Sequence, residues 1–174
     1  MICPDCQTEN IPGADECESC GQDLRNLDLP GVKDVFTYHL LHDQLGDVVK
    51  ETTTIAPGEP VALAVHHMQH QETGCVLVME EDQLVGIITE RDILLKAAGE
   101  NVDLNAVAVR ELMTQDPVIL REEDTLAVAL HKMSIGGFRH IPLVTKGQVT
   151  GIVSVRDLLH HVADFIQEQP ASAP

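Results

Sequence analysis

A seven-residue pattern occurs twice in this chain, 65 positions apart. It reads Gly-Ile-Ile-Thr-Glu-Arg-Asp over residues 86–92 and Gly-Ile-Val-Ser-Val-Arg-Asp over residues 151–157. In each copy a short apolar run ends at a hydroxyl residue, and an aspartate follows three positions later. Because a repeated unit must form the same local structure twice, this duplication constrains the architecture more than any other feature of the chain.

The duplication extends over a whole supersecondary unit. Apolar spacings of three and four predict helices, and β-branched runs bounded by turn residues predict strands. The elements expected are residues 53–55, 61–70, 75–79, 84–89 and 90–98 in the first copy, and 118–120, 126–134, 141–144, 149–154 and 155–166 in the second. Each β-α-β-β-α unit exposes one apolar sheet face. The predicted fold is therefore α/β (α+β), with two pseudo-symmetric repeats packed sheet to sheet.

Composition narrows the class of protein and of ligand. Aromatic residues make up only 2% of the chain, so a planar ligand would be held between aliphatic side chains. A formal net charge of −17 argues against nucleic acid and anionic membranes as partners, because both attract clustered Lys and Arg. The sequence shows neither a long apolar run nor a signal-like start, which predicts a cytoplasmic protein. Nothing in it assembles a nucleophile, a base and an orienting group, so we expect no enzyme activity.

Four of the five cysteines lie in the first twenty residues, as two Cys-x-x-Cys pairs separated by ten residues. The four are Cys3, Cys6, Cys17 and Cys20. This spacing can place four sulfurs around one Zn²⁺. The zinc would be structural and not catalytic, because four thiolate ligands leave no open coordination position. Metal ligation of about 10–16 kcal/mol would stabilise a segment too short to fold by burial alone. The segment resembles the zinc-ribbon family, although Gln7 stands where the first glycine of its CPxCG knuckle is usual.

Two other interpretations of these cysteines have less support from the sequence. A pair of disulfides needs an oxidising compartment, and a thioredoxin-like motif needs a βαβ context that this segment lacks. The ribbon is acidic, so contact with a protein partner is expected rather than contact with nucleic acid. The predicted domains are the zinc ribbon, a linker with a helix near 33–44, two repeats and a frayed tail, at residues 1–25, 26–44, 45–104, 105–168 and 169–174.

The repeat ending in G-[IV]-[IV]-[TS]-x-x-D resembles the cystathionine-β-synthase (CBS) domain. The phrases Val-Arg-Glu-Leu-Met-Thr at 109–114 and Phe-Arg-His-Ile-Pro-Leu-Val at 138–144 carry the same resemblance. It implies a Bateman module of two repeats, usually a homodimer formed through helices. It also implies two clefts that in many members take adenine nucleotides or related adenosyl ligands. We therefore expect a regulatory ligand sensor that signals to a partner through the zinc ribbon or the dimer surface.

The duplicated corners suit such a ligand. An ionised carboxylate can accept hydrogen bonds from both hydroxyls of a ribose. A hydroxyl beside the amides of a helix N-terminus can donate to a phosphate. By resemblance, Ser154 and Asp157 would hold a nucleotide whose phosphate meets Arg139 and His140. The residues expected to flank its adenine are Val118 and Ile152.

The first copy offers a less complete set. Its candidate ligand residues are Thr53, Ile87, Thr89 and Asp92. The positions that match Arg139 and His140 are Gly74 and Cys75, so the cationic pair is missing from this copy. We expect unequal sites, with the better nucleotide site around Asp157. Binding of Mg²⁺ together with a polyphosphate is an open alternative.

Other interpretations need no nucleotide. Both Thr-x-x-Asp and Ser-x-x-Asp are helix capping boxes, which stabilise a helix start without any ligand. The whole chain could also be a nucleic-acid-binding regulator that uses the ribbon, or a structural interaction adaptor with empty clefts.

Overall fold

The computed structural model describes residues 2–11, 14–24, 35–97 and 102–167. The chain divides into two compact units, Met1–Tyr38 and His39–Pro174. Residues 26–34 of the linker expected at 26–44, and the whole tail expected at 169–174, lie outside the described residues. Among the helices that are described, none has both the length and the apolar character needed to cross a membrane.

The first unit consists of two similar turns, each containing one Cys-x-x-Cys pair. An antiparallel bridge closes each turn, between Ile2 and Glu9 and between Glu16 and Asp23. The buried apolar side chains of its described residues are Cys3, Cys17 and Leu24. Two of the four cysteines therefore form part of its small core.

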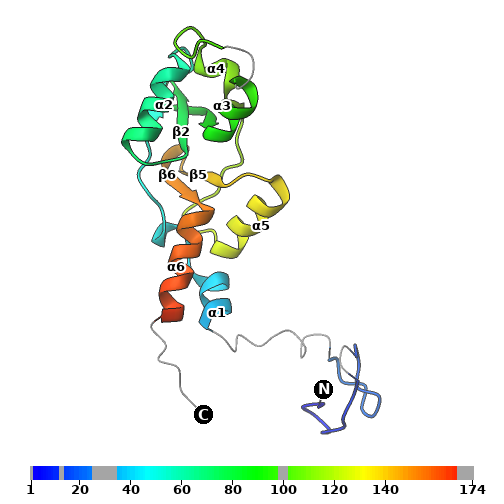
Figure 1. Cartoon of the computed structure of the whole chain (residues 1–174). Helices are drawn as coiled ribbons and strands as arrows, with labels where there is room; N and C mark the ends of the chain where they lie inside the picture. Colours follow the sequence, from blue (N-terminus) through cyan, green and yellow to red (C-terminus); the bar gives the residue numbers. More distant parts are fainter. Residues whose placement is uncertain (1, 12–13, 25–34, 98–101, 168–174) are drawn as a thin grey trace. The chain divides into compact units, whose positions relative to one another are not determined.

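The second unit contains both repeats (Figure 1). The elements leading into and forming the first repeat are α1 (Val35–His42), the 3₁₀ helix η1 (Leu45–Asp47), β1 (Thr54–Ile55), α2 (Val61–His70), β2 (Cys75–Glu80), β3 (Gln83–Thr89) and α3 (Glu90–Ala97). Those leading into and forming the second are α4 (Val109–Leu112), β4 (Thr114–Gln115), α5 (Leu126–Gly136), β5 (His140–Thr145), β6 (Gln148–Ser154) and α6 (Val155–Gln167). The predicted α+β fold is confirmed, with helices and hairpins at the expected places.

One predicted strand is wrong. In the described part of the chain, residues 118–119 join no strand, and only Leu120 makes a single parallel bridge, to Leu143. Pro117 has no amide hydrogen to donate to a ladder, and the side chains of Val118 and Ile119 are exposed. The short strand β4 lies before this position and pairs elsewhere.

The two repeats exchange their entry segments. The strand β4 leads into the second repeat, yet it pairs antiparallel with β3 of the first, where Thr114 lies opposite Ile87. Lys50, at the start of the first repeat, pairs with Ile152 of β6 through two backbone hydrogen bonds of 3.0 Å. Each sheet therefore has an edge supplied by the other repeat.

Three apolar clusters form the core of the second unit. One is built on α2, β2 and β3 of the first repeat and includes α4, which leads into the second. Another is built on α5, β5, β6 and α6 of the second repeat and includes Leu45 and Val48 from the start of the first. The third joins the two sheets, since it contains Cys75, Leu77, Ile87 and Ile152. These shared residues place the two sheets against each other, in agreement with the predicted sheet-to-sheet packing.

The glycine that opens each copy of the pattern makes room for the exchanged segment. A Cβ atom added at Gly151 would lie 2.5 Å from the carbonyl oxygen of Lys50 and would also overlap the side chain of Val49. A Cβ atom at Gly86 would lie 2.7 Å from Met113 Sδ and 3.0 Å from the carbonyl oxygen of Thr114. Only glycine lets the crossing backbone approach this closely.

Replacement of Gly151 by alanine should destabilise the second unit by about 2 kcal/mol, because the added methyl group must displace a backbone carbonyl. Urea unfolding followed by circular dichroism measures the loss. Gly46→Ala is the matched control, since its Cβ would be 3.5 Å from the nearest atom of Glu122, an ordinary contact. Equal unfolding midpoints for the two variants would contradict this explanation of the repeated glycine.

Candidate functional site

The four amino-terminal cysteines converge. Their sulfur atoms all lie within 4.8 Å of one another, with 3.6 Å between Cys3 and Cys20 and 3.5 Å between Cys6 and Cys17. None of the four forms a disulfide. Sulfurs bound tetrahedrally to Zn²⁺ at about 2.3 Å lie about 3.8 Å apart. The donor set and its spacing therefore fit one Zn²⁺.

Neighbouring groups favour the thiolate form at Cys6 and Cys17. At Cys20 the backbone hydrogen bond from Gln22 is outweighed by the neighbouring cysteines, which raise the pKa of that thiol to about 12. The side chain and backbone of Thr8 hydrogen-bond the Cys6 sulfur and lower the pKa of that thiol to about 6. Asn10 is buried, and its Nδ2 donates to Cys17 Sγ over 3.5 Å. Gln7 has a φ of 60° and Gly21 a φ of 73°, so both turns have the same left-handed backbone. The departure from glycine at position 7 leaves the turn intact.

The hydroxyl and the aspartate of each repeated corner bond to each other. The Thr89 hydroxyl and amide donate to Asp92 Oδ2 over 2.6 and 3.0 Å, and the Asp92 amide donates back to Thr89 Oγ1 over 3.2 Å. Ser154 and Asp157 make the same three bonds, at 2.5, 3.1 and 3.3 Å. The capping interpretation is thus confirmed at both corners. In each aspartate this cap engages Oδ2.

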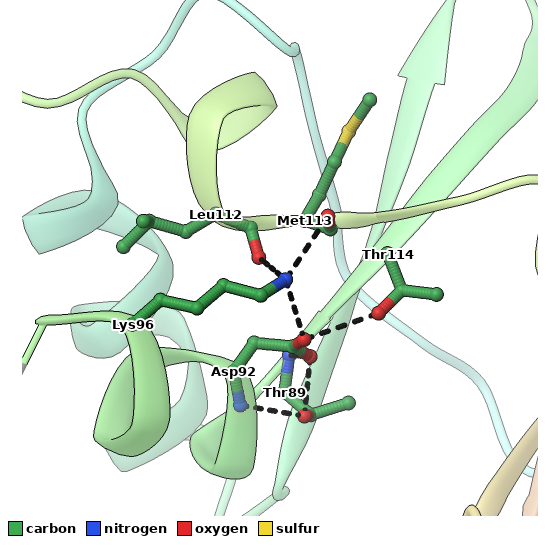
Figure 2. Close-up of polar contacts among 6 residues, drawn as sticks. All are labelled: Thr89, Asp92, Lys96, Leu112, Met113 and Thr114. Carbon is green, nitrogen blue, oxygen red and sulfur yellow. Dashed lines mark hydrogen bonds and ion pairs between the residues drawn. The ribbon is translucent and has the colours of Figure 1, made fainter.

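The other carboxylate oxygen of Asp92, Oδ1, accepts hydrogen bonds from one residue of the first repeat and from one residue of the exchanged strand β4 (Figure 2). Lys96, one turn later on α3, donates to Asp92 Oδ1 over 3.0 Å, and the hydroxyl of Thr114 donates to the same atom over 3.1 Å. Lys96 also donates to the carbonyl oxygens of Leu112 and Met113, over 2.7 and 3.4 Å. The Lys96 ammonium therefore donates to three different acceptors.

At Asp157 the other oxygen has a different partner. The ammonium of Lys50, from the exchanged entry segment, pairs with Asp157 Oδ1. The Lys50 side chain is 67% exposed, whereas that of Asp157 is 11% exposed. The position on α6 that corresponds to Lys96 is His161, whose Nε2 lies 2.7 Å from Asp43 Oδ2. The second repeat therefore has no lysine on its own helix to hold the carboxylate.

Both aspartates are ionised at neutral pH. Burial opposes their ionisation, but the hydrogen bonds from Thr89 and Lys96 outweigh it and lower the pKa of Asp92. In the same way Lys50 and Ser154 lower the pKa of Asp157 despite its burial. The pKa of His140 is also lowered, because of burial and the neighbouring charge of Arg139, so its ring is neutral at pH 7.

Two cavities are bordered by all of the predicted ligand residues except Thr53. The larger, of about 1770 Å³, is bordered by Ile152, Ser154, Asp157, Arg139, His140 and Lys50, among others. The smaller, of about 260 Å³, is bordered by Ile87, Thr89, Asp92, Val118, Arg139 and His140, among others. Each aspartate thus lies at a cavity, and the cavities differ greatly in size.

The structure corrects how the residues were grouped. Val118 borders the cavity of Asp92 and not that of Asp157, because the entry segments are exchanged between the repeats. Thr52 of the first entry segment borders the Asp157 cavity, and the neighbouring Thr53 donates its hydroxyl to the side chain of Gln71.

The expectation that the cationic pair is missing at the first corner is also corrected. Arg139 and His140 lie between the two corners and border both cavities. Gly74, which occupies the position of Arg139 in the first repeat, leaves room for the His140 ring, since a Cβ there would lie 3.3 Å from His140 Cε1.

The family model for the CBS domain matches residues 45–99 and 109–164 of this chain. The chain belongs to the CBS-domain family. An uncharacterized 17.7 kDa protein of Acidianus ambivalens is 35% identical over 112 residues, which cover 63% of this chain and 66% of that protein. A CBS domain-containing protein of Arabidopsis thaliana is 29% identical over 65% of this chain, which spans only 20% of that larger protein.

A solved structure shares the fold of this CBS chain. It is a CBS domain protein from Pyrobaculum aerophilum complexed with AMP, with a TM-score of 0.61 and 21% sequence identity. The match covers 70% of this chain and 98% of the Pyrobaculum protein.

Two site residues of the CBS repeats escaped the sequence analysis. Lys96 follows Asp92 by four positions on one helix, a spacing that favours an ion pair and could have been noticed. Lys50 meets Asp157 from the other repeat, more than a hundred residues away, and no local pattern indicates this contact.

Proposed function

We propose that this CBS chain is a regulatory module that binds an adenine nucleotide, or a related adenosyl ligand, in the cavity around Asp157. The observation that carries the proposal is the set of groups that borders one cavity. An ionised carboxylate, a hydroxyl at a helix start, an arginine and an aliphatic wall lie together there. The complex of the Pyrobaculum relative with AMP supports the same class of ligand.

Each group has a chemical role in this proposal. Asp157 accepts hydrogen bonds from the ribose hydroxyls through Oδ1, since its Oδ2 is engaged by the cap. Arg139 and the first amides of α6 bind the phosphate, because the start of a helix attracts anions. Ile152 packs against the adenine in place of an aromatic ring.

The cavity around Asp92 is less suited to a nucleotide than the cavity around Asp157. Its volume is about 260 Å³, and its carboxylate already accepts bonds from Thr89, Lys96 and Thr114. A ligand there must displace the well-held Lys96. We propose that this second site is weaker or takes a smaller ligand.

A ligand at Asp157 would contact both repeats, since Thr52 and Glu90 of the first repeat border the cavity beside Ser154 of the second. Binding would thereby bias how the repeats pack on each other. We propose that a homodimer surface or the cysteine unit, with one structural Zn²⁺, transmits this change to a partner. Leu94 and Leu159, at equivalent positions of α3 and α6, are 66% and 55% exposed and suit a dimer surface.

Calorimetric titration of the purified protein, freed of bound small molecules, tests the proposal with AMP, ADP, ATP and S-adenosylmethionine. We expect saturable binding of at least one of them. If AMP binds, 2′-deoxy-AMP should bind about tenfold more weakly, because Asp157 loses one charge-assisted hydrogen bond. An absence of heat with all four ligands would contradict the sensor and leave the structural adaptor with empty clefts.

A further inference from the structure

Lys50 occupies the carboxylate oxygen that the proposed ligand needs. The cap engages Asp157 Oδ2, and the ammonium of Lys50 pairs with Oδ1. An oxygen of this kind has about two lone pairs, so both ribose hydroxyls can bond Oδ1 only if Lys50 moves away. The protein therefore contains its own competitor for the ligand.

The surroundings of Lys50 allow its side chain to move while its backbone stays in place. Its amide and its carbonyl both bond Ile152 over 3.0 Å, which fixes the Cα atom at the edge of β6. Its side chain is 67% exposed and contacts solvent along most of its length. An ion pair this exposed is weak, so a ligand can displace it easily. Lys96 differs, since the carbonyl oxygens of Leu112 and Met113 hold it in addition to Asp92.

The charges at the cavity indicate where the displaced ammonium goes. The larger cavity is bordered by three residues with fixed positive charge, Lys50, Arg139 and Arg156, and by four carboxylates, Glu51, Glu72, Glu90 and Asp157. A phosphate entering this cavity meets few cations, and a triphosphate would be repelled. Once the ribose takes Asp157, Lys50 has lost the carboxylate with which it pairs in this structure.

We propose that Lys50 is a specificity-determining residue that exchanges partners when a ligand binds. The ribose hydroxyls replace its ammonium at Asp157, and the ammonium then pairs with the phosphate. The cavity thereby selects a nucleoside monophosphate over the uncharged nucleoside. This inference rests on the proposed function of the Asp157 cavity.

Calorimetric titration with AMP and with adenosine tests the exchange in the full-length protein and in Lys50→Gln. The measured quantity is the ratio of the adenosine to the AMP dissociation constant. In Lys50→Gln we expect this ratio to fall about tenfold, because AMP loses a charge-assisted bond while adenosine loses only a competitor. Lys50→Met should give the same fall, and Lys50→Arg should retain the ratio.

Lys132→Gln is the matched control. It removes one positive charge from an exposed position on α5 that borders neither cavity, and its ratio should equal that of the wild-type protein. An unchanged ratio in Lys50→Gln and Lys50→Met would overturn the role of Lys50 while AMP binding itself still stands. If the wild-type protein binds neither AMP nor adenosine, the inference is overturned together with the monophosphate site on which it rests.

Discussion

Replacing Cys17 with serine is expected to remove zinc from the protein and to unfold residues 2–24. Cys17 is 3% exposed and forms the core of the first unit with Cys3 and Leu24. So small a core cannot replace the roughly 10–16 kcal/mol that binding of a structural zinc supplies. Elemental analysis should show about one zinc per wild-type chain and close to none in the variant, and limited proteolysis should cut the variant within this unit.

Cys75→Ala separates loss of the metal from general loss of a thiol. Cys75 is buried between the sheets of the second unit, and burial raises the pKa of its thiol to about 12, so it stays uncharged. We expect this variant to retain zinc fully. Full zinc content in Cys17→Ser, with an unchanged proteolysis pattern, would contradict the metal site.

Replacing Asp157 with asparagine is expected to weaken binding of AMP about a hundredfold. A neutral amide loses the charge that strengthens both ribose hydrogen bonds, and each such bond contributes about 1.5–3 kcal/mol. The fold should persist, because the altered cap at Ser154 costs only about 1 kcal/mol. Calorimetry measures the affinity, and thermal unfolding confirms that the variant is folded.

Two further variants sharpen this comparison. Asp103→Asn removes one negative charge at an exposed position that borders neither cavity, and AMP binding should be unaffected. Asp92→Asn should weaken binding less than tenfold, because that carboxylate borders the smaller cavity. The reverse order, with a large loss in Asp92→Asn and none in Asp157→Asn, would move the nucleotide to the other corner.

Much of the secondary structure follows from short-range patterns. The helix expected at 61–70 is α2 with the same ends, and the strands of both hairpins were placed within about a residue. These predictions succeed because helix and strand periodicities depend on residues a few positions apart. The cysteine cluster could be predicted in the same way, because each Cys-x-x-Cys pair brings its own two sulfurs together. The structure places all four sulfurs within 4.8 Å of one another.

Short-range patterns could not predict which ligand residues belong to the same cavity. Sliding the repeat by 65 positions aligns Val118 with Thr53, but the alignment does not say which corner each of them faces. The sequence analysis assigned Val118 to the corner of its own repeat, and the structure places it at the other. Lys50 was missed for the same reason, because its partner Asp157 belongs to the opposite repeat.

The sequence by itself determined that an α-β-β-α core is built twice, that the last helix of each copy is capped by a box containing an aspartate, and that four thiols gather near the start. Each of these properties depends on residues close together in the chain. The tertiary structure alone decided that the entry segments cross over, that Gly86 and Gly151 must accommodate them, and that Lys50 lies on Asp157. Those outcomes depend on how two nearly equivalent units dock, which residue spacing along one chain does not encode.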